Sequence, residues 1–220
     1  MAIVTTNSPK AALGGLHYCT NHTGKMSGLH SISTSVAVNP YCIKRQQDGN
    51  SICSYCFAAA MMKQYKSLNE CTTRNAEILT ASVLPLEVLP LIPTRYFRFE
   101  SFGDLINVNQ VINYFNIARK NPDTLCALWT KNPQIIAKAM NLYGIEKPKN
   151  LQIVLSSPFV NKAIKATRFD FVDKVFTVYD KNESKKVDIN CGARSCLACG
   201  RCYRPNPDGV KLQHIREILK

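Results

Sequence analysis

The sequence predicts an α/β fold in which parallel strands form a partial (βα) barrel, followed by a cysteine-rich C-terminal segment that binds a cluster. Short apolar runs alternate with amphipathic stretches through the middle of the chain, and the connections between them are short. This alternation is typical of βα units and a parallel sheet. The units are too few for a full eight-stranded barrel.

The individual elements follow from local patterns. β-branched and apolar residues favour strands over residues 30–39, 96–100, 124–130, 151–156 and 174–179. Strong helix formers, or apolar residues at helical spacing, favour helices over 54–67, 73–81, 107–120 and 133–142. Residues 1–30 lack a sustained period, so we expect irregular structure there. We therefore predict a barrel domain over 1–185, with residues 186–220 packed on it.

Composition and charge restrict the class of protein. The 220 residues suffice for one sizeable core, and no apolar stretch approaches the ~20 residues that span a bilayer. We expect a cytoplasmic protein without a membrane partner. Lysine and arginine number 28 against 15 acidic residues, a net charge of +13. Because the basic residues are spread along the chain, a solvated surface explains them most simply, with nucleic acid as an alternative partner.

The C-terminal cysteines have a spacing that indicates a metal site. Cys191, Cys196, Cys199 and Cys202 follow the pattern C-x4-C-x2-C-x2-C, with small residues between the thiols. Small residues let the backbone wrap closely around an iron–sulfur core, as in ferredoxin-type loops. Zinc ribbons also use C-x2-C pairs, so zinc remains an alternative. Ten cysteines in a reducing compartment are not expected to form disulfides.

A second cysteine group lies directly after the first predicted strand. Cys42, Cys53 and Cys56 give C-x10-C-x2-C, and Tyr55 precedes the last of them. Three ligands leave one corner of a four-iron cluster open, so that a small molecule can bind that iron. The pattern alone also suits a zinc or redox site.

Polar residues follow two of the later strands. Glu100 and Asp104 come after the strand at 96–100, and Lys131 follows the strand at 124–130. Ligand sites of parallel sheets lie at the carboxyl ends of the strands, so we expect these three to bind a cofactor. Asp104 also suits a cap of the next helix. Trp129 is predicted to belong to the core.

Three cysteines stand apart from both groups. Cys126 lies within an apolar strand and is predicted to be a small buried hydrophobe, as is Cys71. No spacing completes a metal site around Cys19.

These motifs occur in an order that resembles a known family. The segments CSYCFA, FRFESFGD, ALWTKNP and CLACGRCY, within residues 25–203, are similar to the phage gene product 88 family of radical-SAM-like proteins. The resemblance implies a partial βα barrel, a four-iron cluster and phage origin, hence the host-cell cytoplasm. It implies that Cys42, Cys53 and Cys56 hold a [4Fe-4S] cluster, and that Tyr55 lies against the adenine of S-adenosylmethionine.

Two functions from different classes follow. The first is an iron–sulfur protein, with the upstream cluster able to bind S-adenosylmethionine as a redox enzyme and the C-terminal cluster auxiliary. In a variant of it, the two cysteine groups combine on one metal centre. The second is a zinc-stabilised basic nucleic-acid-binding protein without catalysis. Neither indicates an oligomeric state or a substrate.

Overall fold

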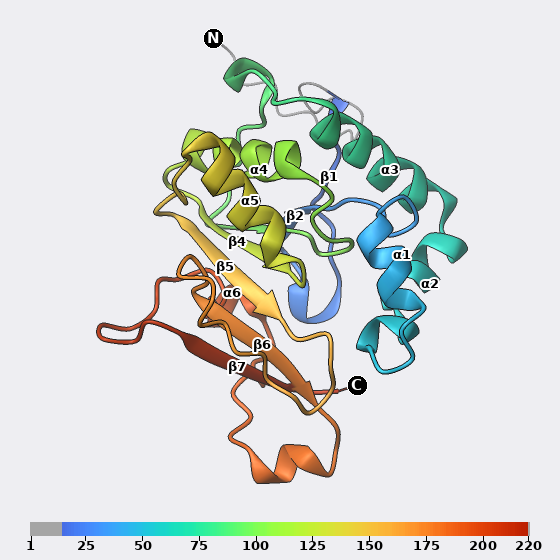
Figure 1. Ribbon diagram of the computed structural model, residues 1–220, viewed down its shortest axis with the longest axis vertical. Helices are drawn as coiled ribbons and strands as arrows, with labels where there is room; N and C mark the ends of the chain where they lie inside the picture. The colour runs from blue at the N-terminus through green and yellow to red at the C-terminus, as the bar shows by residue number, and fades with distance from the viewer. Residues whose placement is uncertain (1–14, 220) are drawn as a thin grey trace.

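The computed structural model describes residues 15–219, and its centre is one open sheet of seven strands (Figure 1). The strands are β1 (Tyr18–Cys19), β2 (His30–Ile32), β3 (Tyr96–Phe99), β4 (Leu125–Thr130), β5 (Leu151–Ser156), β6 (Lys174–Tyr179) and β7 (Gln213–Ile218). They lie side by side in the order of the chain. β1 pairs antiparallel with β2, and every later pairing is parallel.

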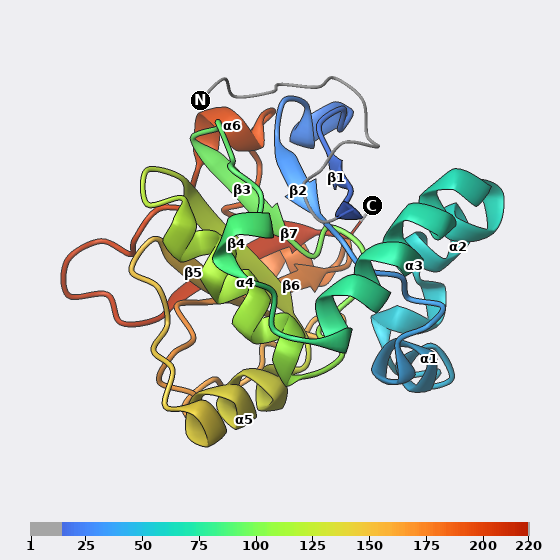
Figure 2. The same cartoon turned by 90° about the horizontal axis from the view of Figure 1, so that it is seen from above.

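Helices cover the sheet unequally. They are α1 (Pro40–Gln46), α2 (Phe57–Gln64), α3 (Lys66–Ala81), α4 (Val108–Lys120), α5 (Pro133–Tyr143) and α6 (Cys196–Cys199). Helices α4 and α5 lie on one face of the sheet, whereas α6 lies on the other (Figure 2). Helices α1 and α2 lie to one side of the sheet (Figures 1 and 2). The α6 face is therefore the one that the C-terminal segment covers.

Alternation along the strands separates two buried clusters, because successive side chains of a strand point to opposite faces. Phe97, Phe99 and Leu128 pack in the large core against α4 and α5. Tyr96 and Ala127 belong to a smaller cluster on the other face, which also contains residues of the C-terminal segment. Arg98 lies two residues after Tyr96 on β3, so its side chain also faces the C-terminal segment.

Most of the central elements agree with the sequence predictions. The strands at 151–156 and 174–179 are confirmed over their whole length, and those at 96–100 and 124–130 are one residue shorter. The helices predicted at 107–120 and 133–142 are confirmed within a residue. The alternation of strand and helix thus gives the α/β class and a mostly parallel sheet.

The predicted strand at 30–39 is wrong beyond Ile32. The next three residues, Ser33, Thr34 and Ser35, are buried, and their hydroxyl groups form hydrogen bonds with the loop after β3 and with Asn69 of α3. Asn39 then accepts hydrogen bonds from two amides of the first turn of α1, which starts at Pro40. Asparagine before proline is a helix-start signal that competes with the β-branched pattern.

Further differences concern the helical region and the ends of the described chain. The helix predicted at 54–67 is divided into a 3₁₀ helix, Ile52–Tyr55, and α2, while α3 starts seven residues before the predicted 73. Within the predicted irregular segment 1–30, residues 15–30 contain β1, and residues 1–14 lie outside the described part. The sequence prediction also missed β7, which has one buried apolar residue, Ile215, because it lies at the sheet edge.

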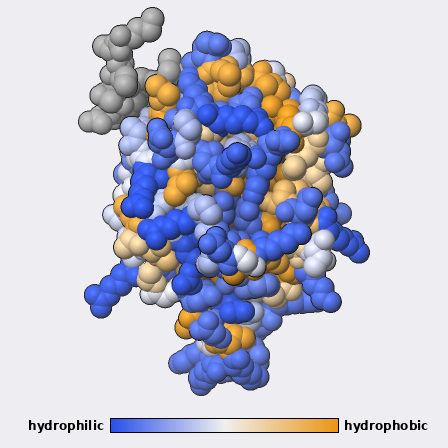
Figure 3. All heavy atoms as spheres, turned by 90° about the vertical axis from the view of Figure 1, so that its left-hand side faces the viewer, coloured by the Kyte–Doolittle hydropathy of each residue, from blue (hydrophilic) through white to orange (hydrophobic). Residues whose placement is uncertain are grey.

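The surface opposite α1 and α2 is largely hydrophilic. Figure 3 shows small, separate apolar areas among many polar side chains on this face. Isolated apolar residues on a surface are ordinary. No helix within residues 15–219 has both the length and the apolar character needed to cross a membrane.

Candidate functional site

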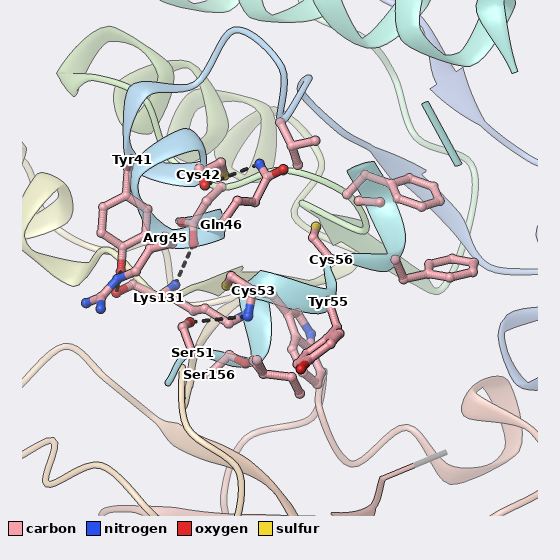
Figure 4. Close-up of a pocket in the computed structure, with 18 of the residues that line it drawn as sticks. Tyr41, Cys42, Arg45, Gln46, Ser51, Cys53, Tyr55, Cys56, Lys131 and Ser156 are labelled. Atoms are coloured by element: carbon pink, nitrogen blue, oxygen red, sulfur yellow. Dashed lines mark hydrogen bonds between the residues drawn. The ribbon is translucent and has the colours of Figure 1, made fainter. Parts of the chain in front are cut away.

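A cavity of about 900 Å³ lies at the carboxyl ends of strands β3, β4 and β5. It is the place where a parallel sheet is expected to bind a ligand. Its wall includes all seven of the residues that the sequence predicted outside the C-terminal segment: Cys42, Cys53, Tyr55, Cys56, Glu100, Asp104 and Lys131. Figure 4 shows five of these residues around the cavity.

Three thiols come to this cavity from two places in the chain, the first turn of α1 and the 3₁₀ helix Ile52–Tyr55 with the cap residue that follows it. Cys42 lies in the first turn of α1, where the Asn39 side chain accepts a hydrogen bond from its amide. Cys53 lies in the 3₁₀ helix, with its amide donating to Ser51 Oγ at 3.2 Å. Cys56 is the cap residue directly before α2. Capping thus fixes the backbone of the first two thiols.

The pKa of the Cys42 thiol depends on the other acidic groups of the cavity wall. Burial raises the pKa of the Cys42 thiol, and the carboxyl groups of Asp104 and Glu100 raise it further. Cys53 and Cys56 act on the same thiol in the same direction. A bound cation or cluster would reverse this effect, because positive charge favours the thiolate.

Tyr55 contributes an exposed aromatic ring to the wall. Its side chain is 88% exposed although it lines the cavity, so it lies at the opening. In Figure 4 it lies close to Cys53. Nearby, the rings of Phe57 and Phe102 stack with their centroids 6.2 Å apart. The opening of the cavity is therefore aromatic.

Glu100 is a buried carboxyl group in the wall, with 2% of its surface exposed. Its Oε1 accepts hydrogen bonds from Tyr114 Oη at 2.6 Å and Gln110 Nε2 at 2.7 Å, and Thr34 donates to both oxygens. Burial raises the pKa of Glu100 to about 8, although the bonds from Tyr114 and Thr34 oppose this. The residue is therefore largely protonated at neutral pH.

The backbone around Glu100 is strained. Glu100 has a φ of +59°, a region that non-glycine residues rarely adopt. Gly103 has a φ of +82°, and a Cβ atom there would lie 2.4 Å from the Thr34 carbonyl oxygen. Such strain clusters at ligand sites, where the surrounding structure holds it in place.

Asp104 connects the β3 loop to the end of β4. Its Oδ1 accepts from Thr130 Oγ1 at 2.5 Å, and its Oδ2 accepts from the Lys131 amide at 2.8 Å. The alternative that Asp104 caps the next helix is wrong, because Asn107 is the residue whose side chain caps α4. Asp104 therefore positions Thr130 and Lys131 in the cavity wall.

A second, much smaller cavity lies on the α6 face of the sheet. It measures about 40 Å³, and Cys191, Cys196, Cys199 and Cys202 all line it. Burial raises the pKa of Cys202 to about 12, and the other three thiols act on it in the same direction. The four C-terminal cysteines therefore converge, as the spacing predicted.

Close backbone contacts position this cysteine segment. Ser195 caps α6, and Gly200 ends it with a φ of +61°. A Cβ atom on Gly200 would lie 2.5 Å from Tyr96 Oη, so only glycine permits this approach to the sheet. Tyr96 also accepts a hydrogen bond from Arg204 Nε at 2.8 Å and stacks on Tyr203 at 5.0 Å.

The two groups of thiols line different cavities, and no cysteine lines both. The geometry therefore does not favour one metal centre that combines the two groups. Within residues 15–219, no three side chains of His, Cys, Asp or Glu come close enough to hold a single metal ion. Each group of thiols therefore surrounds a cavity and not the position of a single metal ion. All ten cysteines are free.

The cysteines outside the two groups agree only partly with expectation. Cys126 is fully buried, as predicted. Cys71 is only partly buried, so the prediction of a buried hydrophobe is wrong there: it lies in α3, whose buried face consists of Thr72, Asn75, Ala76 and Leu79. Cys19 donates to Asn21 Oδ1 at 3.3 Å.

Three residues of the cavity walls were missed from the sequence. Trp129 was assigned to the core, but it is only partly buried and lines both cavities, as does Arg98. Lys25 donates to Cys191 Sγ at 3.3 Å and pairs with Glu217 at 2.7 Å. Alternation along the strands at 96–100 and 124–130 would have placed Arg98 and Trp129 on one face. No local signal connects Lys25 with a cysteine 166 positions away.

Comparison with known proteins gave no family and no relative. The family models, the curated proteins and the solved structures that were compared with this chain gave no match, so the resemblance to the phage gene product 88 family stays a prediction.

Proposed function

We propose that this chain is an iron–sulfur protein whose large cavity holds a four-iron cluster through Cys42, Cys53 and Cys56. One iron remains open there to a small molecule. The C-terminal cysteines hold a second cluster with all four of their thiols. This function agrees with the resemblance to phage-encoded radical-SAM-like proteins and suits the host-cell cytoplasm, where thiols stay reduced.

One observation carries the proposal: three thiols from two separate places in the chain line a cavity that is far larger than they need for themselves. Thiolates hold iron–sulfur clusters, and three of them leave an iron with an open position. The remaining volume is available to a second molecule. A single zinc ion binds thiolates at about 2.3 Å, whereas the thiolates of a four-iron cluster surround a larger core.

Unsatisfied polar atoms in the wall support an additional ligand. Ser101 Oγ and Trp129 Nε1 are buried and have no hydrogen-bond partner among the described residues. Both residues line the large cavity. Buried polar groups are nearly always hydrogen-bonded, so the pair fits a missing polar molecule at this position.

The sheet fits a partial (βα) barrel as the scaffold. Its parallel strands follow one another in chain order, which is the order of a βα barrel rather than of a doubly wound sheet. The C-terminal segment lies on the face that would be the barrel interior. We propose that this segment fills part of the interior of the incomplete barrel.

S-adenosylmethionine is our candidate for the small molecule. If bound next to a reduced cluster, this molecule could take up the electron needed for its reductive cleavage. Tyr55 would stack on the adenine at the opening, and the Lys131 ammonium group would neutralise the methionyl carboxylate. Glu100, when protonated, can donate a hydrogen bond to the ligand from the buried wall, while Asp104 fixes the backbone that carries Lys131.

Metal and sulfide analysis of anaerobically purified protein tests the cluster. We expect iron and acid-labile sulfide in equal amounts, with broad visible absorbance. Cys53→Ala should lose the iron of the large cavity only. Cys71→Ala is the matched control, because this partly buried thiol lines neither cavity. Colourless protein that carries zinc without sulfide would refute the proposal.

Binding of the cofactor is tested separately. Adding S-adenosylmethionine to the dithionite-reduced protein should change the electron-spin spectrum of the open cluster and produce cleavage of the cofactor. The Cys53→Ala protein should give neither. An unchanged spectrum in wild-type protein with full iron content would refute the binding of S-adenosylmethionine but not the presence of the cluster.

A zinc-stabilised nucleic-acid-binding protein is the second candidate. The observation that favours it is the net charge of +13 together with exposed aromatic rings, Tyr55 and Phe57, beside the cavity. Such rings stack on unpaired bases. This candidate predicts binding of single-stranded oligonucleotides that weakens steeply with salt, and absence of binding at low salt would exclude it.

A further inference from the structure

Arg98 and Trp129 are the two residues whose side chains line both cavities. They lie on adjacent strands, β3 and β4, and point to the same face of the sheet. The guanidinium carbon of Arg98 lies 4.2 Å from the centroid of the indole ring. The pair therefore forms a common wall between the two cysteine sites.

The charge of Arg98 is not neutralised within the described residues. It takes part in none of their ion pairs. Its polar contacts are weak: Nε donates to the Glu100 carbonyl at 3.4 Å, and Nη1 lies 3.7 Å from Met26 Sδ. A partly buried cation without a carboxylate partner fits a position next to a negatively charged group.

Arg98 lines the small cavity together with all four C-terminal thiols. Lys25 is a second cation there, and its ammonium group donates to Cys191 Sγ at 3.3 Å. Lys25 lines only the small cavity, whereas Arg98 also reaches the large one.

Trp129 positions Arg98 and also has an indole N–H group that is available to donate a hydrogen bond. The ring contacts Phe176 edge-on, with centroids 4.6 Å apart, so the indole is fixed between Phe176 and the guanidinium group. Its buried Nε1–H has no acceptor among the described residues. A cluster sulfide or a cysteine sulfur in either cavity would provide that acceptor.

We propose that Arg98, held on Trp129, raises the reduction potentials of both cysteine sites. This inference rests on the proposed iron–sulfur function. An electron accepted by either cluster from an external reductant such as dithionite would increase the negative charge of that cluster by one. The shared cation would stabilise both reduced states, and its loss would shift both potentials to more negative values.

A set of charge-removing variants tests the sharing. Potentials would be measured by electron-spin spectroscopy during stepwise reduction, with the Cys53→Ala protein used to assign the signal of the small cavity. Arg98→Gln should shift both potentials to more negative values. Lys25→Gln should shift only the small-cavity potential, and Lys131→Gln only the large-cavity one, because each lysine lines one cavity.

Conservative variants separate charge from folding. Arg98→Lys keeps the cation and should retain most of both potentials, while Trp129→Phe keeps a ring but removes the N–H and should shift the potentials less than Arg98→Gln. If Arg98→Gln retains its iron and shifts one potential or neither, the inference is wrong. Absence of iron in the wild-type protein would instead refute the proposed function.

Discussion

The two cysteine cavities differ in volume and in the number of thiols. The cavity at the carboxyl ends of the strands has three thiols and about 900 Å³, while the cavity beneath α6 has four thiols and about 40 Å³. Four thiols complete the coordination of a cluster and leave almost no other space. Three thiols in a large volume leave both an open iron and room for a ligand.

The charges of the two walls differ as well. The large cavity is lined by two buried carboxyl groups, Glu100 and Asp104, together with four basic side chains, Arg45, Arg98, Lys131 and Lys162. The small cavity is lined by Lys25, Arg98 and Arg201 and by no carboxyl group of the described residues. Cations stabilise the negative charge of a cluster that has four thiolates. A carboxyl group with a raised pKa is typical of a site that exchanges protons or binds a polar ligand. Under the proposed function, the small cavity would hold a group and the large one would also admit a molecule.

The largest effect should come from the small cavity. Cys202→Ala removes a partly buried thiol that packs against the buried cluster on the α6 face of the sheet and that we propose as a cluster ligand. We expect it to lose the iron of that site and on the order of 4 kcal/mol in the free energy of unfolding. Denaturant unfolding and iron analysis measure both, with Cys71→Ala as control. A Cys202→Ala protein as stable as the wild type would contradict a holding role.

The next effect concerns the buried carboxyl of the large cavity. The pKa of Glu100 is about 8 in the folded protein and about 4.3 in an unfolded chain. Between these values the folded chain keeps a proton that the unfolded chain releases. Stability contributed by Glu100 therefore falls as pH rises from about 4.3 to about 8. Above pH 8 it is constant.

Glu100→Gln should remove this dependence. The free energy of unfolding of the variant should rise relative to wild type between pH 5 and pH 8, and the difference should then level off. Urea unfolding at several pH values measures it. Parallel curves for the two proteins would mean that the carboxyl is ionised in the folded state and that the wall is not a neutral hydrogen-bond donor.

A smaller effect on stability is expected for the thiols of the large cavity. Cys53 lies in a short 3₁₀ helix and is only partly buried. Cys53→Ala should therefore change the free energy of unfolding by about 1 kcal/mol or less while removing the iron of that cavity. Thermal unfolding with iron analysis measures this. A loss of stability as large as that caused by Cys202→Ala would show that both cysteine sites stabilise the fold.

The smallest effect on stability belongs to the opening of the large cavity. Tyr55 is 88% exposed, so Tyr55→Ala should change stability by less than about 0.5 kcal/mol. Loss of an aromatic stacking partner should weaken S-adenosylmethionine binding about tenfold, which calorimetric titration measures. Tyr65→Ala is the matched control, since this exposed tyrosine does not line the cavity. Equal weakening in both variants would exclude stacking on Tyr55.

The sequence by itself determined the central elements and the assignment of seven cysteines to two groups. Apolar periodicity over residues 107–120 and 151–156 gives a helix and a strand because burial of one face or of a whole strand fixes the pattern locally. The C-x2-C spacings place thiols on one turn of chain, so each group can be recognised without its surroundings. The polar residues after the strands follow from the general position of ligand sites in parallel sheets.

Only the tertiary structure decided which residues separate and join the two sites. Arg98 and Trp129 belong to different strands, and their contact depends on the parallel register of β3 and β4. Lys25 meets Cys191 because the chain end returns to the sheet as β7. Such contacts depend on strand register and chain return over long sequence separations, and no local pattern encodes them, because their energy is gained only once the sheet has formed.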